Sequence, residues 1–189
     1  MRIIAGSRRG TVLTRLDTVN TRPTADRVRE SLFNVLQGGQ FGSCVYNAHV
    51  IDLFAGSGAL GLEALSRGAA HASFIETNQD ALVVIRANIA KLRFQDCCDV
   101  IAGNATGITR WRSNRANLVF ADAPYASGDG LLAVVNLARI DALASDAVLV
   151  IETDKTETLD KNQLDYAGLT LLKQRGYGRA MLHFLRLKS

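Results

Sequence analysis

The chain is poor in the residues that mark disulfide-stabilised, disordered and membrane-spanning proteins. Its 189 residues include 3 Cys and 2 Pro, and 6% are aromatic. Three cysteines, two of them adjacent, give no disulfide framework, and neither these nor the 3 His have the spacing of metal ligands. No apolar run reaches the roughly 20 residues of a membrane span. Because 48% of the residues are hydrophobic, we expect a compact soluble protein, without a metal and without a membrane partner.

Basic residues are concentrated toward the two ends of the chain. Residues 1–30 hold seven Arg against three acidic residues, and this excess of four equals the net charge of +4 of the whole chain. Clustered arginines favour a polyanion, because guanidinium groups bind phosphates with paired hydrogen bonds. A basic surface without such a partner is the alternative, and charge alone does not decide between them. The first ten residues lack the apolar stretch of a signal peptide, so we expect a cytoplasmic protein.

Hydrophobic residues follow the strand period and the helix period in turn. Residues 2–5 and 11–14 alternate and predict a basic hairpin or extended arm, and residues 23–36 have helical spacing. From residue 49 onward, short β-branched runs alternate with helical stretches; strands are expected at 50–54, 72–75, 100–101, 117–120 and 147–151, and helices at 60–67, 80–92 and 130–143. This order predicts an α/β fold with a mostly parallel sheet covered by helices on both faces.

The end of the chain has a different pattern. Residues 164–173 and 180–187 read as an antiparallel strand pair that closes the sheet. We find no internal repeat and no linker. The sequence therefore predicts a single domain, 1–189, in which a basic arm and helix (1–40) precede the ligand-binding core (41–189).

A glycine-rich loop lies between the first core strand and the helix after it. Gly56, Gly58 and Gly61 spell G-x-G-x-x-G, and Glu76 follows 20 residues after Gly56. Glycines let the backbone approach a ligand, the helix N-terminus offers free N–H groups, and a carboxylate at this spacing binds a ribose diol. The pattern predicts a nucleoside cofactor but does not by itself separate NAD from S-adenosylmethionine.

Two further features favour S-adenosylmethionine over NAD. Asp52 stands inside the first strand, where an acid suits a cationic amino-acid moiety better than a pyrophosphate. The second feature is Asp122-Ala123-Pro124-Tyr125, which follows the apolar run 118–120. It places an acid, a proline and an aromatic ring at the carboxyl edge of the sheet, where folds of this kind bind ligands.

These residues resemble class I S-adenosylmethionine-dependent methyltransferases, and the D/N-P-P-Y/F motif of amino-group methyltransferases in particular. Residues 22–34, with the pattern R-P-T-x-D-R-V-R-E, and residues 52–58 look like the RsmD family of 16S ribosomal RNA guanine-N2 methyltransferases. The resemblance extends from Arg2 to the turn at Tyr177-Gly178. It implies a Rossmann-like methyltransferase with a seven-stranded sheet, acting on the N2 amine of guanine 966 in small ribosomal subunits or their assembly intermediates. A monomer is expected.

The resemblance also implies roles for individual residues. The expected cofactor-binding residues are Asp52, Phe54, Gly56, Ser57, Gly58, Glu76, Thr77, Asn104 and Ala105. The expected catalytic residues, which would hold the target base, are Asp122, Ala123, Pro124 and Tyr125. Asn104 and Ala123 depart from the family pattern, which usually has Asp and Pro there. We expect weaker cofactor binding from the first change and slower turnover from the second.

The expected chemistry needs acceptors rather than a metal. The Asp122 carboxylate and the Ala123 carbonyl would accept both hydrogens of the guanine amine and direct its lone pair toward the methyl group. Tyr125 would stack on a base splayed out of its RNA loop. The residues expected to bind phosphates are Arg8, Arg9, Arg22, Arg27 and Arg29.

Three other functions fit part of the pattern. A non-catalytic RNA-binding or assembly factor is compatible with the departures at Asn104 and Ala123. An NAD-dependent oxidoreductase shares the glycine fingerprint. A DNA adenine-N6 methyltransferase uses similar strand-end chemistry, but the chain has no insert for target recognition.

Overall fold

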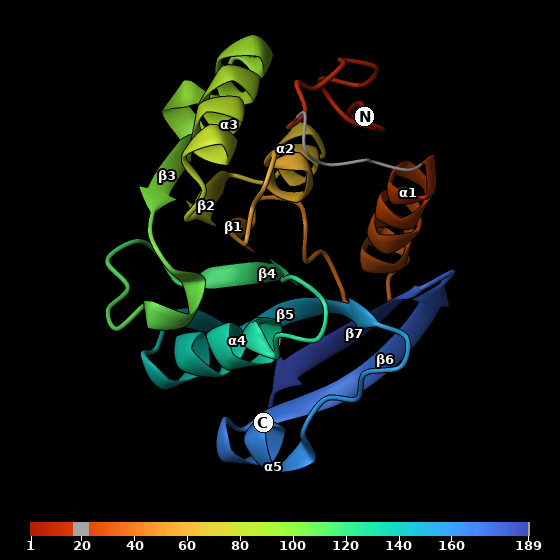
Figure 1. The fold of residues 1–189 in the computed structure, drawn as a ribbon, viewed down its shortest axis with the longest axis vertical. Coiled ribbons are helices and arrows are strands. Elements are labelled where there is room, and N and C mark those ends of the chain that lie inside the picture. Colours follow the sequence, from red (N-terminus) through yellow and green to blue (C-terminus); the bar gives the residue numbers. More distant parts are fainter. Residues whose placement is uncertain (17–22, 189) are drawn as a thin grey trace.

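One mixed sheet forms the centre of the molecule (Figure 1). The computed structural model describes residues 1–16 and 23–188, the side chains of residues 23–25 excepted. In this part of the chain, seven strands are arranged in the order β3-β2-β1-β4-β5-β7-β6. Their bounds are β1 His49–Leu53, β2 His71–Glu76, β3 Cys98–Ala102, β4 Ala116–Asp122, β5 Leu143–Asp154, β6 Leu169–Tyr177 and β7 Ala180–Leu187.

Among the described strands, only β7 runs in the opposite direction. β1 to β5 pair in parallel, whereas β7 is antiparallel to both β5 and β6. The predicted α/β fold with a closing antiparallel pair is therefore confirmed. The strand order reverses between β1 and β4, and folds of this type bind ligands outside the carboxyl ends of the strands at such a switch point.

The helices cover both faces of the sheet. They are α1 Pro23–Gln37, α2 Ala59–Ser66, α3 Gln79–Leu92, α4 Asp129–Arg139 and α5 Lys161–Tyr166, with two 3₁₀ turns, η1 Gln95–Cys97 and η2 Ala105–Gly107. Apolar residues of α1, α2 and α3 share one core with the sheet, and those of α4 and α5 share another. In α1, Leu32, Phe33 and Leu36 are almost fully buried, as their helical spacing predicts. None of the described helices is long and apolar enough to cross a membrane.

Several predicted boundaries around β5 and β6 are wrong by four or five residues. The strand expected from residue 164 begins only at Leu169, because residues 161–166 form α5, whose first turn is capped by the Asp160 carboxylate. The helix expected to run from 130 to 143 ends at Arg139. Asp141 then adopts a positive φ of 58°, and the chain enters β5 at Leu143.

The N-terminal segment is folded against the core rather than extended from it. Arg2 pairs with Val12 in an antiparallel bridge, which confirms the predicted hairpin. Ile3 and Leu13 are buried in the same core as α1 and α2. Gly6 has φ +82°, and a Cβ there would lie 1.7 Å from the Ser66 carbonyl oxygen, so only glycine permits this approach. Figure 1 shows this arm, residues 1–16, beside α2.

Candidate active site

The glycine loop turns the chain sharply from β1 into α2. Phe54, Gly56 and Gly58 have positive φ values of 58°, 55° and 78°. Gly61 has a different function, because a Cβ there would lie 2.4 Å from the Phe74 ring. Its lack of a side chain lets α2 pack closely on β2, as the third glycine of this motif does in nucleotide-binding folds.

Glu76 holds this loop through its carboxylate. One oxygen accepts a hydrogen bond from Gly56 N at 2.8 Å. The other accepts from Thr77 N at 2.8 Å and Asn78 N at 2.9 Å. Thr77 Oγ1 also donates to this second oxygen, at 3.5 Å. Among the described residues only Gly56 N donates to the first oxygen, which has two lone-pair sites, so Glu76 can accept one further hydrogen bond there from a ligand. The carboxyl end of β2 is thereby tied to the glycine loop after β1.

A cleft of about 740 Å³ opens in front of this loop. Seven of the predicted site residues line it: Arg29, Asp52, Phe54, Gly56, Ser57, Asp122 and Tyr125. Its wall also includes residues that were not predicted from the sequence: Met1, Arg15, Leu16, Leu32, Glu152, Tyr177, Gly178, Arg179 and Ala180. The cleft therefore combines the carboxyl edge of the sheet with the arm, α1 and the β6–β7 turn.

Asp52 lies at the bottom of the cleft and is 2% exposed. Its Oδ2 accepts a hydrogen bond from Gly61 N at 2.9 Å. Burial, and to a smaller degree the nearby Glu76 carboxylate, raise its pKa from 3.8 to about 7. Among the described residues, no Lys or Arg side chain forms an ion pair with the Asp52 carboxylate.

Asp122 and Glu152 form a carboxylate pair at the ends of β4 and β5. The two residues are opposite each other in the parallel register. Asp122 is exposed to the cleft, at the end of a largely buried strand that partly desolvates its carboxylate. This desolvation, followed by the nearby Glu152 and Asp52 carboxylates, raises the pKa of Asp122 to about 8. Burial likewise raises the pKa of Glu152. Together with Asp52, the pair makes the floor of the cleft strongly acidic.

Tyr125 is held in place from two sides. Its hydroxyl donates a hydrogen bond to Glu152 Oε1 at 2.9 Å. The guanidinium of Arg179, from the β6–β7 turn, lies 5.4 Å from the centre of its ring. Arg179 in turn forms an ion pair with Asp154, which lowers the pKa of Asp154 to about 2. The predicted stacking residue is thus positioned by β5 and the β6–β7 turn.

The remaining predicted residues lie around the cleft rather than along its wall. Ala123 and Pro124 line a smaller adjoining cavity of about 150 Å³, together with Tyr125. Gly58 caps α2, and Thr77 follows β2. Ala105 is buried under η2. These positions surround the carboxyl ends of β1 to β4, and their predicted roles stay predictions.

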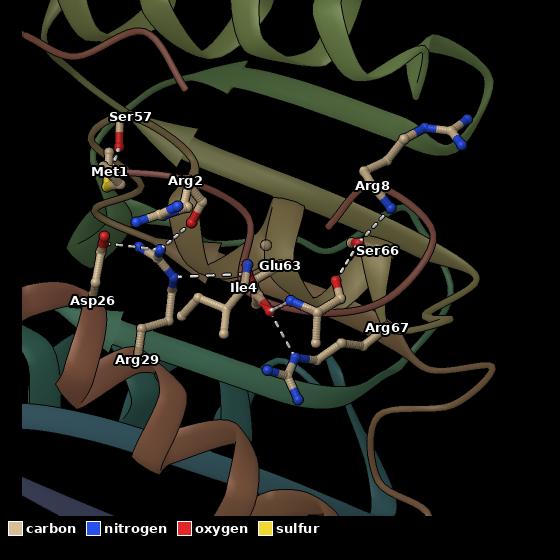
Figure 2. A network of polar contacts seen from close by, with 12 residues as sticks. Met1, Arg2, Ile4, Arg8, Asp26, Arg29, Ser57, Glu63, Ser66 and Arg67 are labelled. Atoms are coloured by element: carbon tan, nitrogen blue, oxygen red, sulfur yellow. Dashed lines mark hydrogen bonds and ion pairs between the residues drawn. The ribbon is translucent and has the colours of Figure 1, made fainter. Parts of the chain in front are cut away.

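Glu63, fully buried on α2, fixes the arm (Figure 2). Its Oε2 accepts a hydrogen bond from Ile4 N at 2.8 Å, and its Oε1 accepts from Ala5 N at 3.0 Å. The Nε atoms of Arg67 and Arg29 lie 2.7 Å and 3.8 Å from the same carboxylate. Both oxygens are therefore satisfied by the arm and by two arginines, and Met1 is brought to the cleft beside Ser57.

The predicted phosphate-binding arginines have different environments. Arg9 and Arg27 are exposed. Arg8 is half-buried, with its Nε donating to the Leu92 carbonyl at 2.7 Å. Arg29 does not fit the predicted role: it is 4% exposed, and its guanidinium is bound by the Arg2 carbonyl, Asp26 and Glu63. Arg22 lies outside the described residues.

The chain is similar to known methyltransferases over most of its length. A family model described as "Conserved hypothetical protein 95" matches residues 1–186. Ribosomal RNA small subunit methyltransferase D of Escherichia coli is 39% identical over 155 residues, which cover 82% of this chain and 75% of that protein. Its namesake in Haemophilus influenzae is 33% identical over 181 residues, 94% of this chain and 89% of that protein. The chain belongs to this family, the RsmD family of methyltransferases.

Solved structures agree with this assignment. The Escherichia coli protein yhhF has a TM-score of 0.84 at 33% identity, and the match covers 100% of this chain and 98% of that one. Magnesium protoporphyrin IX methyltransferase from Synechocystis, with bound S-adenosylmethionine, has a TM-score of 0.67 at 11% identity, covering 92% of this chain and 86% of that one. The second likeness shows the fold alone.

Asn104, one of the two departures from the RsmD pattern, has its side chain engaged within the protein. Its Oδ1 accepts hydrogen bonds from Thr106 N and Thr106 Oγ1, both at 2.9 Å, and so caps η2. The side-chain oxygen that was expected to accept a hydrogen bond from an adenine amine therefore already accepts two within the protein. This occupation adds to the expected weakening of cofactor binding in this RsmD-family chain.

Among the cleft residues of this RsmD-family protein that were not predicted from its sequence, Glu152 and Arg179 contact Tyr125. Glu152 follows the apolar run 147–151 much as Asp122 follows the run 118–121, and this position could have identified it as a site residue. Arg179 carried no comparable signal, because only the β6–β7 turn brings it over Tyr125. Among the described residues, no group of His, Cys, Asp and Glu side chains is arranged to hold a metal ion.

Proposed function

We propose that this protein transfers a methyl group from S-adenosylmethionine to the N2 amine of a guanine in 16S ribosomal RNA, in the cytoplasm and as a single-domain monomer. The observation that carries the proposal is the floor of the cleft. Three carboxylates, Asp52, Asp122 and Glu152, face a space next to a glycine loop, and the pKa of each is raised. Such a site favours a cationic ligand and opposes an anionic one.

The residues present fit S-adenosylmethionine. Its bound form supplies a methyl group on a positively charged sulfonium. Asp52 and the backbone of residues 56–58 would hold the methionine end, and Glu76 keeps one acceptor site for a ribose hydroxyl. A pyrophosphate, as in NAD, would lie against the three carboxylates, so the charge of the cleft supports the methyltransferase over the oxidoreductase.

The switch point divides the site into two halves. The glycine loop and Glu76 belong to β1 and β2, whereas Asp122, Tyr125 and Glu152 belong to β4, β5 and the loop after β4. In the second half, the Asp122 carboxylate and the Ala123 carbonyl accept the two hydrogens of the amine. The amine lone pair then points toward the first half, where the methyl group is held. Catalysis rests on this alignment and on the acceptors.

The exposed arginines of the N-terminal part supply contacts to phosphates. Arg9 and Arg27 are accessible, and Arg15 lies at the rim of the cleft. Guanidinium groups near the entrance to an acidic cleft attract the RNA backbone while the base enters between the carboxylates. The fixed arm therefore gives the RNA a defined orientation relative to Asp122.

Transfer of a radiolabelled methyl group tests the proposal. Small ribosomal particles that lack the modification should incorporate label from S-adenosylmethionine, and digestion of the RNA should yield N2-methylguanosine. Particles that already carry the methyl group serve as the control and should remain unlabelled. Binding of the RNA without incorporation would contradict the proposal and favour a non-catalytic assembly factor.

A further inference from the structure

The strand order places two carboxylates side by side in the substrate half of the cleft. β4 and β5 are neighbours, and their register puts Glu152 directly opposite Asp122. Adjacent strands lie about 4.8 Å apart, so both side chains can contact the same edge of one planar base. Asp122 has an assigned partner in the amine, whereas Glu152 has none in the reaction described above.

We propose that Glu152 accepts a hydrogen bond from N1–H of the target guanine and thereby selects guanine over adenine and cytosine. This inference rests on the proposed function. Guanine presents N1–H directly beside its exocyclic amine, whereas adenine and cytosine present a ring-nitrogen acceptor beside theirs. An ionised carboxylate is an acceptor only, so it binds the first arrangement and repels the second.

The contacts of Glu152 leave one oxygen available for this purpose. Oε1 accepts from the Tyr125 hydroxyl at 2.9 Å. Oε2 accepts no hydrogen bond from the part of the chain that the structure describes. The hydrogen bond from the Tyr125 hydroxyl fixes the Glu152 carboxylate. The ring of the same Tyr125 is expected to stack on the base. Glu152 is therefore oriented by the same residue that would set the plane of the base.

Three acceptors then match three donors. The Asp122 carboxylate and the Ala123 carbonyl accept from the two amine hydrogens, and Glu152 accepts from N1–H. Desolvation, and after it the repulsion from Glu152, raises the pKa of Asp122 in the free protein, and these donors compensate both when they arrive. A base with an acceptor in place of N1–H would leave Glu152 without its hydrogen bond and facing a lone pair.

A base analogue isolates this contact. 2,6-Diaminopurine keeps the exocyclic N2 amine but has an acceptor at N1. Small-subunit particles are assembled with 16S RNA in which a ligated synthetic segment carries either guanine or 2,6-diaminopurine at the target position. For the wild-type protein, kcat/KM should be roughly 10- to 100-fold higher with guanine, the discrimination expected for a paired base-edge contact. Equal rates on the two bases would overturn the proposal.

Glu152→Gln provides a second test, because the glutamine amide can donate a hydrogen bond to N1 of the analogue. The guanine preference should fall to within about threefold or reverse, since the amide N–H₂ pairs with an acceptor at N1. Tyr125→Phe is the comparison variant: it removes the hydroxyl that orients Glu152 but keeps the carboxylate, so its rates should fall while its guanine preference stays above that of Glu152→Gln. If Glu152→Gln lowers both rates by the same factor, Glu152 acts only on Tyr125 and the inference is wrong.

The outcomes separate this inference from the proposed function. No methyl transfer to guanine by the wild-type protein overturns both. Transfer to guanine with no preference over the analogue, or a preference that Glu152→Gln leaves unchanged, overturns only the role of Glu152. Glu152→Asp keeps the charge on a shorter side chain, and it should retain the preference at a reduced rate.

Discussion

Two groups of carboxylates in this protein have opposite environments. Glu63 is fully buried and is satisfied by two backbone N–H groups and two arginines. Asp52, Asp122 and Glu152 lie together on the floor of one cleft, and no Lys or Arg of the described part of the chain forms an ion pair with them. The first arrangement fixes the arm, and the second stores charge for a ligand.

The difference shows how one residue type serves structure and function. A buried carboxylate stabilises a fold only when its partners compensate the lost hydration. When partners are missing, the pKa rises and the site favours whatever restores them, whether a proton, a cationic ligand or hydrogen-bond donors.

Asp122→Ala should remove methyl transfer most completely. We expect kcat to fall by roughly 100- to 1,000-fold, because the amine loses its charged acceptor, while calorimetry should find cofactor binding largely retained. Asp96→Ala, at an exposed position in η1, is the matched control and should keep full activity. A variant at Asp122 that still transferred methyl at the wild-type rate would place the chemistry elsewhere.

Glu63→Gln should destabilise the fold rather than the chemistry. Loss of its charge leaves Arg29 and Arg67 without their buried partner, so the free energy of unfolding should drop by about 3–5 kcal/mol. Guanidinium denaturation measures this change. Glu30→Gln, on the exposed side of α1, should change stability by less than about 0.5 kcal/mol. Equal effects would mean that Glu63 is not the anchor of the arm.

The stability of the ligand-free protein should fall as the pH rises from about 5 to 8. Asp52 and Asp122 have folded-state pKa values of about 7 and about 8, against 3.8 as the ordinary value. The folded protein therefore binds protons that the unfolded chain has lost, and stability decreases with pH in this window.

Asp122→Asn should remove most of this pH dependence. The Tm of the variant should exceed that of the wild type by a few degrees at pH 8, because about 1 kcal/mol corresponds to roughly 2–4 °C at this size. At pH 5 the folded wild-type protein keeps the proton on Asp122, so the difference should be smaller there. Differential scanning calorimetry at both pH values makes the comparison, and a difference of the same size at both would remove the charge explanation.

Arg9→Ala should have the smallest effect. Arg9 is exposed on the arm, so its loss should weaken RNA binding modestly and lower the slope of log K against log salt by about one. Arg112→Ala, in the exposed loop that precedes β4, should leave the slope unchanged because that loop lies at the amino edge of the sheet. If both variants gave the same slope, the arm would not contact phosphates.

The sequence predicts most of the strands and helices, and it predicts those site residues that belong to short local motifs. Asp52, the glycine loop, Asp122 and Tyr125 were found because each belongs to a short pattern with its own physical reason, and all line the cleft. It missed α5, since six residues in a polar segment carry too weak a helical period. It also placed Arg29 on the surface, because a charge count does not contain the packing of the arm against α2.

Local sequence specifies the alternation of strands and helices, the cofactor loop and the acid at the end of β4, because each depends on residues near one another in the chain. Tertiary packing is needed to place Glu152 opposite Asp122, Arg179 over Tyr125 and Glu63 against the arm. These contacts join residues that are 30, 54 and about 60 positions apart. Strand order, register and burial set them, and a local hydrophobic pattern encodes none of the three.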